Sequence, residues 1–243
     1  MIRYFLAILT LLILACTPNK KDSEETIPEQ PKEEEVIVKQ DTLENEEVIK
    51  KKVIEKSKLY DSSFVNLQKY ADGFSYEMKY ATADNFLKKK VYPCAECLVR
   101  KEVAEALISA NKALQDKGFR IKFFDCYRPL DVQKAMWEIF PNAKYVANPN
   151  TSASIHNRGA AVDITLEDLN GNQLDMGTDF DFFGQEAHHA YTNLPDTVLA
   201  NRQLLKTTME NNGFRAITTE WWHYSFKSKY RYEPSNFKFE CGK

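Results

Sequence analysis

The chain has 243 residues, of which 43% are hydrophobic and 28% are charged, and its 33 basic and 35 acidic side chains give a net charge of −2. A dedicated nucleic-acid-binding protein normally carries a basic excess, so this balance argues against nucleic acid as a partner. The only long apolar run of the sequence lies at its N-terminus, which excludes a protein with several membrane spans. Five cysteines in this length are too few for a disulfide scaffold.

Residues 1–15 have the organisation of an export signal. Arg3 supplies a positive charge, and the apolar run Tyr4–Ala15 is shorter than the roughly 20 residues that a spanning helix needs. The run ends in Ile13-Leu14-Ala15-Cys16, which resembles the lipobox of bacterial lipoproteins. The resemblance implies cleavage before Cys16 and acylation of that residue, so that lipid anchors the protein to a membrane of the cell envelope. An ordinary secretory signal that happens to contain a cysteine is the alternative.

Residues 16–58 differ in composition from the rest of the chain. They are rich in lysine, glutamate and aspartate and contain neither glycine nor aromatic residues, so they bury too little apolar surface to offset their chain entropy. We expect a disordered tether here, with a partial helix through residues 44–58 as the alternative. Residues 59–243 contain nearly all the aromatic residues and are long enough for one compact domain.

Hydrophobic periodicity predicts an α+β fold for this domain. Helices are expected over residues 103–114, 130–140 and 201–212. Strands are expected over residues 119–125 and 160–166 and within residues 214–226, with a turn at residues 168–172 from which Gln173 onward can pair back as a hairpin. Because helices and strands do not alternate regularly, we expect a central antiparallel sheet flanked by helices rather than a doubly wound parallel sheet.

Two histidines and nearby carboxylates point to metal chemistry. His156 precedes the strand that contains Asp163, and Gly159 allows a tight turn between them, so both side chains can face one centre. Glu220 and His223 add a carboxylate and a second imidazole. Two histidines and one carboxylate leave an open position on zinc, and a carboxylate that is not a ligand can take a proton from water. The residue types therefore allow a metallohydrolase site, while a single histidine or glutamate is more often an ordinary polar residue.

Five blocks of sequence carry a resemblance to a known family. They are Tyr80–Phe86; Asp125–Pro129; His156–Asp163; Met176–Phe182 with His188–Ala190; and Asn201–Arg202, Met209–Asn211, Gly213–Phe214 and Glu220–Tyr224. In order and spacing, from about Tyr80 to Tyr224, the chain resembles the zinc D-alanyl-D-alanine dipeptidases, the type known from vancomycin resistance. Five ordered blocks are far more specific than one short motif.

The resemblance implies a zinc ion and the residues that act with it. His156, Asp163 and His223 would be its ligands, and Glu220 would be the general base that later protonates the leaving amine. Two histidines and a carboxylate do not select zinc uniquely, so the metal in the cell stays open.

The resemblance also implies three residues that contact the substrate. Arg128 would bind the scissile carbonyl oxygen as it becomes an oxyanion, because a fixed cation at that point stabilises the transition state more than the ground state. Ser154 and Asp181 match positions that contact the dipeptide. A buried carboxylate that requires an ammonium group would reject longer peptides, in which the corresponding nitrogen is an amide.

Each of these substrate-contacting residues also has a structural interpretation. Arg128 could simply pair with Asp125 in a turn, and Ser154 could be a hydrogen-bonding turn residue. Asp181 could cap a turn, in which case Asp179 could hold the role assigned to it.

Other residues of the blocks are interpreted as structural. His188 and His189 are further potential ligands, but adjacent residues on one element point apart and cannot both face one metal. Trp221 and Trp222 are expected in the core or in the pocket wall.

Four cysteines remain after Cys16, namely Cys94, Cys97, Cys126 and Cys241, and they allow three pairings in an oxidising compartment. A local disulfide between the first two and pairing of each with a more distant cysteine both stay open. Oxidation at Cys126 could affect the active site, because Arg128 is two residues away.

The sequence thus predicts zinc-dependent hydrolysis of D-alanyl-D-alanine to two D-alanines in the cell envelope, for scavenging or turnover of wall-derived peptide. One alternative is a D,D-carboxypeptidase or endopeptidase that acts on peptidoglycan stem peptides. Others are a non-catalytic, zinc-bound lipoprotein that binds wall peptides, and an adhesive lipoprotein with a structural metal.

Overall fold

The computed structural model describes residues 48–49, 63–229 and 231–242. The predicted signal, Cys16 and nearly all of the predicted tether lie outside the described residues. The chain divides into two units, residues 1–48 and 49–243, and all the elements discussed below belong to the second. No helix in the described part of the chain is long and apolar enough to cross a membrane.

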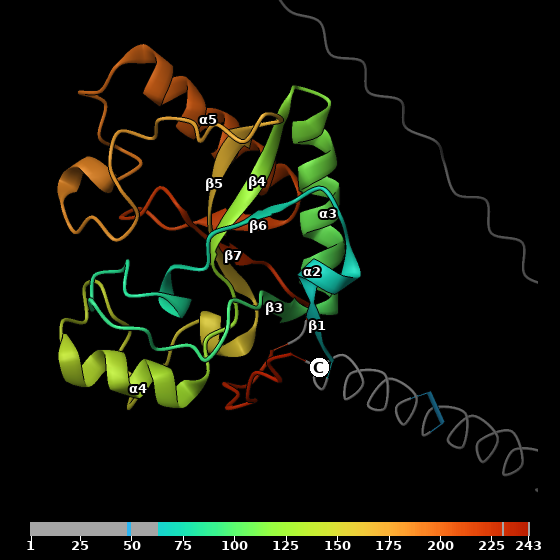
Figure 1. The fold of residues 1–243 in the computed structure, drawn as a ribbon, viewed down its shortest axis with the longest axis vertical. Helices are drawn as coiled ribbons and strands as arrows, with labels where there is room; N and C mark the ends of the chain where they lie inside the picture. Colours follow the sequence, from blue (N-terminus) through green and yellow to red (C-terminus); the bar gives the residue numbers. More distant parts are fainter. Residues whose placement is uncertain (1–47, 50–62, 230, 243) are drawn as a thin grey trace, which may run out of the picture. The chain divides into compact units, whose positions relative to one another are not determined.

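A five-stranded sheet in the order β2-β4-β5-β7-β6 forms the centre of the fold (Figure 1). Its strands are β2 (Ser75–Tyr76), β4 (Phe119–Asp125), β5 (Ala161–Asp168), β7 (His223–Phe226) and β6 (Phe214–Ala216). A separate two-stranded sheet pairs β1 (Phe64–Asn66) with β3 (Leu98–Arg100). The middle strand, β5, is buried along almost its whole length because strands and helices surround it.

The expected α+β class and single domain are confirmed, but the sheet is mixed rather than wholly antiparallel. Ser75 and Tyr76 of β2 lie parallel to Lys122 and Phe123 of β4, whereas the other three pairings of the sheet are antiparallel. The chain between β2 and β4 includes helix α3 (Lys101–Gln115), and a crossover through a helix brings consecutive strands of a sheet together in parallel. A strand of two residues has too little pattern to be predicted.

Two of the helices pack on the sheet and a third lies apart. Helix α3 and helix α5 (Asp196–Asn211) contact each other and the sheet, whereas α4 (Leu130–Ile139) lies away from both (Figure 1). Helix α5 begins at Asp196, earlier than the expected start, because Pro195 fixes an entry conformation directly before it. The remaining helices are short: α2 (Leu67–Tyr70), η1 (Lys79–Ala81), η2 (His156–Arg158) and η3 (Gln185–Ala187).

The turn after β5 is present, and the hairpin beyond it is minimal. Asp168 Oδ1 accepts hydrogen bonds from the backbone N–H groups of Asn170 and Asn172 at 2.8 and 2.9 Å. Gln173 then pairs with Glu167 in a single bridge. The predicted strand over residues 214–226 is two strands, β6 and β7, and the loop between them contains Glu220.

Candidate metal-dependent active site

The order of the strands sets the order of polar residues across the sheet. Asp125 ends β4 and is the register partner of Asp163 on β5, which is in turn the partner of His223 on β7. Partners on neighbouring strands direct their side chains to the same face. Arg215 on β6 and Tyr80, in the η1 turn after β2, flank this row at the two edges of the sheet.

His156 joins Asp125, Asp163 and His223 at the site, and it comes from the η2 turn that precedes β5. Gly159 ends this turn with φ +70°, a left-handed conformation that favours glycine. A Cβ atom on Gly159 would lie 2.4 Å from Cε1 of Phe64, so a side chain has no space there. The turn brings His156 back toward Asp163, as the sequence predicted.

Three donor atoms of these residues converge. Nε2 of His156 lies 3.3 Å from Oδ1 of Asp163 and 3.1 Å from Nδ1 of His223, and the last two atoms are 3.0 Å apart. Tetrahedral ligands about 2.0–2.1 Å from zinc are themselves about 3.4 Å apart, so the trio fits such an ion. Within the described residues, this trio is the one group of His, Cys, Asp and Glu side chains placed to hold a metal.

The surroundings of the donor atoms favour metal binding. Nδ1 of His156 donates to the carbonyl oxygen of Cys126 at 2.7 Å, and Nε2 of His223 lies 3.0 Å from Oγ of Ser225. Protons on these outer nitrogens leave the inner nitrogens free as ligands. Burial raises the pKa of Asp163, but the charges and hydrogen bonds of His156 and His223 outweigh burial and hold that pKa well below its usual range.

Arg128 both pairs with Asp125 and reaches the site. Its Nη2 atom lies 2.6 Å from Oδ2 of Asp125, and its Nη1 donates to Oε1 of Gln133 at 2.9 Å. The guanidinium group also lies 5.1 Å from the ring centre of Tyr80, and the residue lines the cavity that contains the donor trio. The structural pairing therefore fixes the cation at the cavity and is compatible with a role toward substrate.

Asp181 faces the cavity from the β2 edge. It adopts φ +62°, and the hydroxyl of Tyr80 donates to its carboxylate at 3.1 Å. Burial, reinforced by the negative charge of Asp163, raises the pKa of Asp181 to about 8. Asp179 does not line this cavity. It lines an adjacent pocket with Lys79 and Phe182, and Asp181 lines both spaces, so of the two candidate aspartates Asp181 is the one at the donor trio.

Glu220 and Ser154 complete the set that the sequence singled out. Glu220 lines the cavity but does not belong to the metal-holding trio, and burial raises its pKa to about 7 although His223 lowers it. Ser154 also lines the cavity, and its Oγ accepts the backbone N–H of His156 at 3.2 Å. Ser154 thus forms a hydrogen bond within the turn and also lies in the cavity wall.

The cavity has a volume of about 290 Å³ and is polar at both ends. Asp181 lies toward the β2 edge and Arg215 toward the β6 edge. Between them are Asp163 and His223 on strands β5 and β7, with His156 on the η2 turn. A cavity of this size with a carboxylate and a guanidinium at opposite edges suits a small zwitterion.

The other histidines and the tryptophans lie where the sequence placed them. His188 and His189 are outside the metal-holding trio, and His189 lines a separate pocket with Arg202. Trp221 and Trp222 are both almost fully buried, and Trp222 also forms part of the cavity wall.

Tyr80, Gln133 and Arg215 are residues at or beside the cavity whose roles were not predicted from the sequence. Tyr80 lies in the first of the five blocks, but its partner Asp181 is 101 residues away, a separation that no local pattern connects. Gln133 lies five residues after Arg128, in the helix that begins at Leu130. This spacing was a usable signal that the two side chains could meet. Arg215 gave none, because charged residues on edge strands are ordinary.

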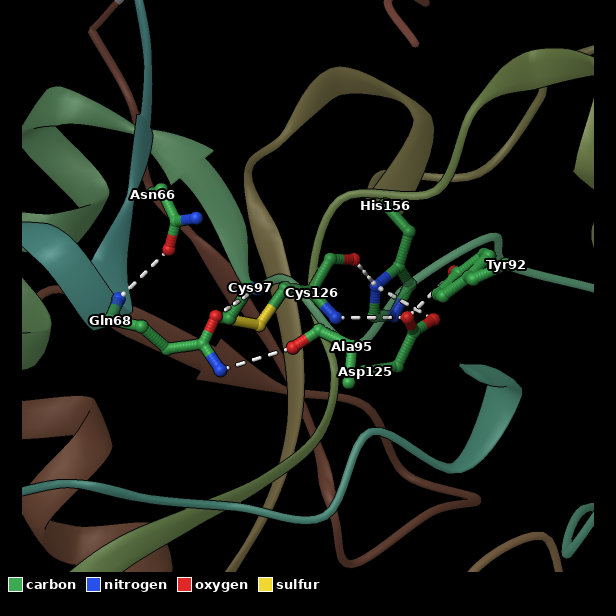
Figure 2. The surroundings of a disulfide bond; sticks show 8 residues. All are labelled: Asn66, Gln68, Tyr92, Ala95, Cys97, Asp125, Cys126 and His156. Carbon is green, nitrogen blue, oxygen red and sulfur yellow. Dashed lines mark hydrogen bonds and ion pairs between the residues drawn. A yellow bond between two sulfur atoms is a disulfide. The ribbon is translucent and has the colours of Figure 1, made fainter. Parts of the chain in front are cut away.

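The disulfides settle the cysteine pairing. Cys94 is bonded to Cys241, and Cys97 is bonded to Cys126. The local bond between Cys94 and Cys97 is therefore not formed. The Cys97–Cys126 disulfide lies beside Asp125 and His156 (Figure 2).

Sequence comparison identifies the family. The profile of the peptidase family described as D-ala-D-ala dipeptidase matches residues 61–241. This chain belongs to that family. A D-alanyl-D-alanine dipeptidase of Escherichia coli (strain K12) is 35% identical over 180 residues, which cover 74% of this chain and 93% of the relative. One of Enterococcus faecium is 33% identical over 196 residues, covering 72% and 96%. Membership in the dipeptidase family makes the chain a metallopeptidase, for which the donor trio is the candidate metal site.

Solved structures give weaker similarities. A vancomycin-resistance D,D-dipeptidase in complex with a D-Ala-D-Ala phosphinate analogue is 20% identical, with a TM-score of 0.36 over 56% of this chain and 53% of that one. A vancomycin-resistance D,D-pentapeptidase variant with Zn(II) is 15% identical, with a TM-score of 0.38 over 54% and 74%. The assignment to the dipeptidase family therefore rests on the sequence matches.

Proposed function

We propose that this protein is a zinc-dependent dipeptidase that hydrolyses D-alanyl-D-alanine to two D-alanines, and that a lipid on Cys16 anchors it in the cell envelope. One observation carries the proposal: the donor trio His156, Asp163 and His223 lies in one small cavity with Glu220 and Asp181. The relatives named for this activity support the substrate.

The metal would be held by the two histidines and Asp163. When bound, zinc would act as a Lewis acid toward the scissile carbonyl and the attacking water. The trio offers three protein ligands, which is the number expected of a catalytic rather than a structural zinc site. This count speaks against a purely structural metal and hence against an adhesive lipoprotein.

Two residues would move protons and stabilise charge. Glu220, whose pKa burial raises to about 7, would take a proton from the attacking water and pass it to the leaving amine. Arg128, held by Asp125 and Gln133, would present a fixed positive charge to the carbonyl oxygen as that atom becomes negative. Because binding alone needs no proton carrier, Glu220 favours an enzyme over a binding protein.

Asp181 and Ser154 would select the dipeptide. The substrate ammonium would pair with the Asp181 carboxylate, and that contact favours the ionised form of this group at neutral pH. Ser154 would contribute its hydroxyl to the bound peptide. A stem peptide presents an amide at the same position, so Asp181 argues against the carboxypeptidase and endopeptidase alternatives.

The test is release of free D-alanine by the purified, zinc-loaded protein from D-alanyl-D-alanine and from an N-acylated D-alanyl-D-alanine peptide. We expect cleavage of the free dipeptide alone, and loss of that cleavage in Glu220→Gln, which keeps the size of the side chain. Cleavage of the acylated peptide would show that the enzyme hydrolyses stem peptides instead. Inactivity on both, with zinc bound, would favour the binding protein.

Residues 1–16 support a location in the cell envelope. An export signal that ends at Cys16 supports a lipid-anchored envelope protein, in which the enzyme would degrade wall-derived dipeptide for scavenging or turnover rather than deplete a cytosolic precursor. Fractionation of cells tests this directly. We expect the protein in the membrane fraction with its leader removed, and a Cys16→Ala variant with an uncut leader. Wild-type protein in the cytosol with an intact leader would refute the location and leave the catalytic proposal standing.

A further inference from the structure

The disulfide between Cys97 and Cys126 lies next to His156, one member of the donor trio (Figure 2). Cys97 precedes β3, Cys126 follows β4, and both residues are fully buried. The bond therefore joins the small β1–β3 sheet to the end of a central strand, next to Asp125 and His156 (Figure 2).

The backbone of Cys126 contacts two residues of the site. Its carbonyl oxygen accepts the Nδ1–H of His156 at 2.7 Å, and its N–H donates to Oδ1 of Asp125 at 2.9 Å (Figure 2). A carbonyl can only accept, so the proton of a neutral His156 is on Nδ1 and its Nε2 keeps the lone pair that faces Asp163. The Cys126 carbonyl thus sets both the ring orientation and the tautomer that a metal ligand requires.

The central sheet does not hold this carbonyl in place. The register of β4 against β5 shifts between Phe123 and Asp125, and Cys126 lies beyond the last pair of that ladder. Its N–H is bonded to a side chain rather than to a strand. The next residue, Tyr127, donates its N–H to the carbonyl of Leu98 at 2.9 Å. The disulfide of Cys126 and the hydrogen bond of Tyr127 therefore both lead to the start of β3, and the following residue, Arg128, donates its N–H to the carbonyl of His156 at 3.1 Å.

We propose that the Cys97–Cys126 disulfide is a positioning element of the metal site, so that full metal affinity and full activity require the oxidised chain. This inference rests on the metal site of the proposed function. The two thiols form the bond by exchange with another disulfide, which takes up their two hydrogens and leaves as two thiols. The chain would therefore complete its active site only in a compartment that supplies disulfides.

The other disulfide, Cys94–Cys241, provides a matched control. The Cys94–Cys241 bond closes a sequence separation of 147 residues, against 29 for Cys97–Cys126, and neither Cys94 nor Cys241 lines the active-site cavity. Loss of a disulfide that closes a longer loop destabilises a fold more in the chain-entropy description. A purely structural account therefore predicts that loss of the control bond is the more harmful.

The experiment compares the full chain with two double variants, Cys97→Ser/Cys126→Ser and Cys94→Ser/Cys241→Ser. Zinc affinity is measured by competition with a chelator, ligand geometry by the visible absorption of bound Co²⁺, and the folded state by circular dichroism. The values of kcat and KM of all three proteins are then measured by steady-state kinetics at saturating zinc.

We expect the Cys97→Ser/Cys126→Ser variant to bind zinc about 10–100-fold more weakly, the range typical for lost support of a metal ligand. Its cobalt spectrum should change, and its kcat should fall while KM stays near the wild-type value, because Asp181 and Tyr80 are untouched. The Cys94→Ser/Cys241→Ser variant should match wild type in zinc affinity and cobalt spectrum.

Equal zinc affinities and cobalt spectra in all three proteins would overturn the inference. If the first variant does not fold, the single disulfide of the Cys94→Ser/Cys241→Ser protein is reduced and reoxidised instead. Reversible loss of zinc affinity in a folded reduced protein supports the inference, and unfolding on reduction assigns the bond to the fold and overturns it. A wild-type protein that shows the expected zinc behaviour but cleaves no dipeptide would refute the proposed function alone.

Discussion

Asp181 and Asp179 are two residues apart in sequence, and both line the pocket next to the cavity of the donor trio. Of the two, Asp181 alone also lines the cavity itself. It has a left-handed backbone, and its carboxylate accepts a hydrogen bond from the hydroxyl of Tyr80. In the proposed reaction, Asp181 is therefore the aspartate placed to meet a substrate amine.

The two aspartates give a direct test of amine recognition. Asp181→Asn should raise KM for D-alanyl-D-alanine by about tenfold to a hundredfold, because a hydrogen bond to a charged group contributes about 1.5–3 kcal/mol. Asp179→Asn should leave KM unchanged. Steady-state kinetics of both variants provide the measurement. Equal KM values for the two variants would show that Asp181 does not take part in substrate binding.

The raised pKa of Asp181 also predicts how stability depends on pH. The pKa is about 8 in the folded state and about 3.9 in an unfolded chain, so between these values the folded protein holds more protons. The free energy of unfolding of the metal-free protein therefore falls as pH rises toward 8, by at most about 1.4 kcal/mol per pH unit for this group. His189, whose pKa burial lowers to about 4, opposes this trend only below about pH 6.5.

Urea unfolding of chelator-treated protein at pH 6.5, 7.25 and 8 measures this dependence. The Asp181→Asn variant should lose stability less steeply than wild type across this range, because its amide does not titrate. Parallel slopes for the two proteins would show that Asp181 does not retain its proton in the folded state.

At the scale of elements, the η2 turn shows how local backbone geometry serves the site. It places His156 against β5 and β7, and it ends at Gly159, where the chain passes close to the ring of Phe64 on β1. The position of this candidate metal ligand thus depends on packing between the β1–β3 sheet and the turn, in addition to the disulfide between that sheet and β4.

Gly159→Ala should destabilise the protein and disturb the metal site. The substitution costs about 1–3 kcal/mol for a left-handed residue with a side chain, and its Cβ would also overlap Phe64 at 2.4 Å. Gly118→Ala is the control, because Gly118 has φ +85° but nothing within 4 Å of an added Cβ. Denaturant unfolding and zinc titration of both variants should show the larger loss at Gly159 in both measurements. An equal loss at the two positions would mean that the contact with Phe64 contributes nothing.

For the whole molecule, the site is assembled from distant parts of the chain. Strands β4, β5 and β7 each contribute one carboxylate or imidazole of the row, and the η2 turn adds the fourth residue. Binding of a metal to the trio would therefore link His223 to residues 60 and 67 positions earlier in the chain and stabilise the folded state as a unit.

Removal of the metal should lower the melting temperature. Zinc at a hundredfold excess over its dissociation constant stabilises the folded state by about 2.7 kcal/mol. Scanning calorimetry with and without a chelator should show this difference in wild type and in His189→Ala, whose histidine is outside the trio. The difference should vanish in His223→Ala. A zinc response that persists in His223→Ala would place the metal elsewhere.

The sequence alone determined the main helices and the long strands, because apolar side chains at periods of 3.6 and 2 report directly which face is buried. It also placed His156, Asp163, Glu220 and His223 in one family pattern. The short strands β1, β2 and β3 and the parallel pairing of β2 escaped prediction, since two or three residues carry no period. The Tyr80–Asp181 hydrogen bond and the Cys97–Cys126 disulfide required the tertiary structure. Such contacts join residues far apart in sequence, and only the packing of strands and turns decides which of several chemically equivalent side chains meet.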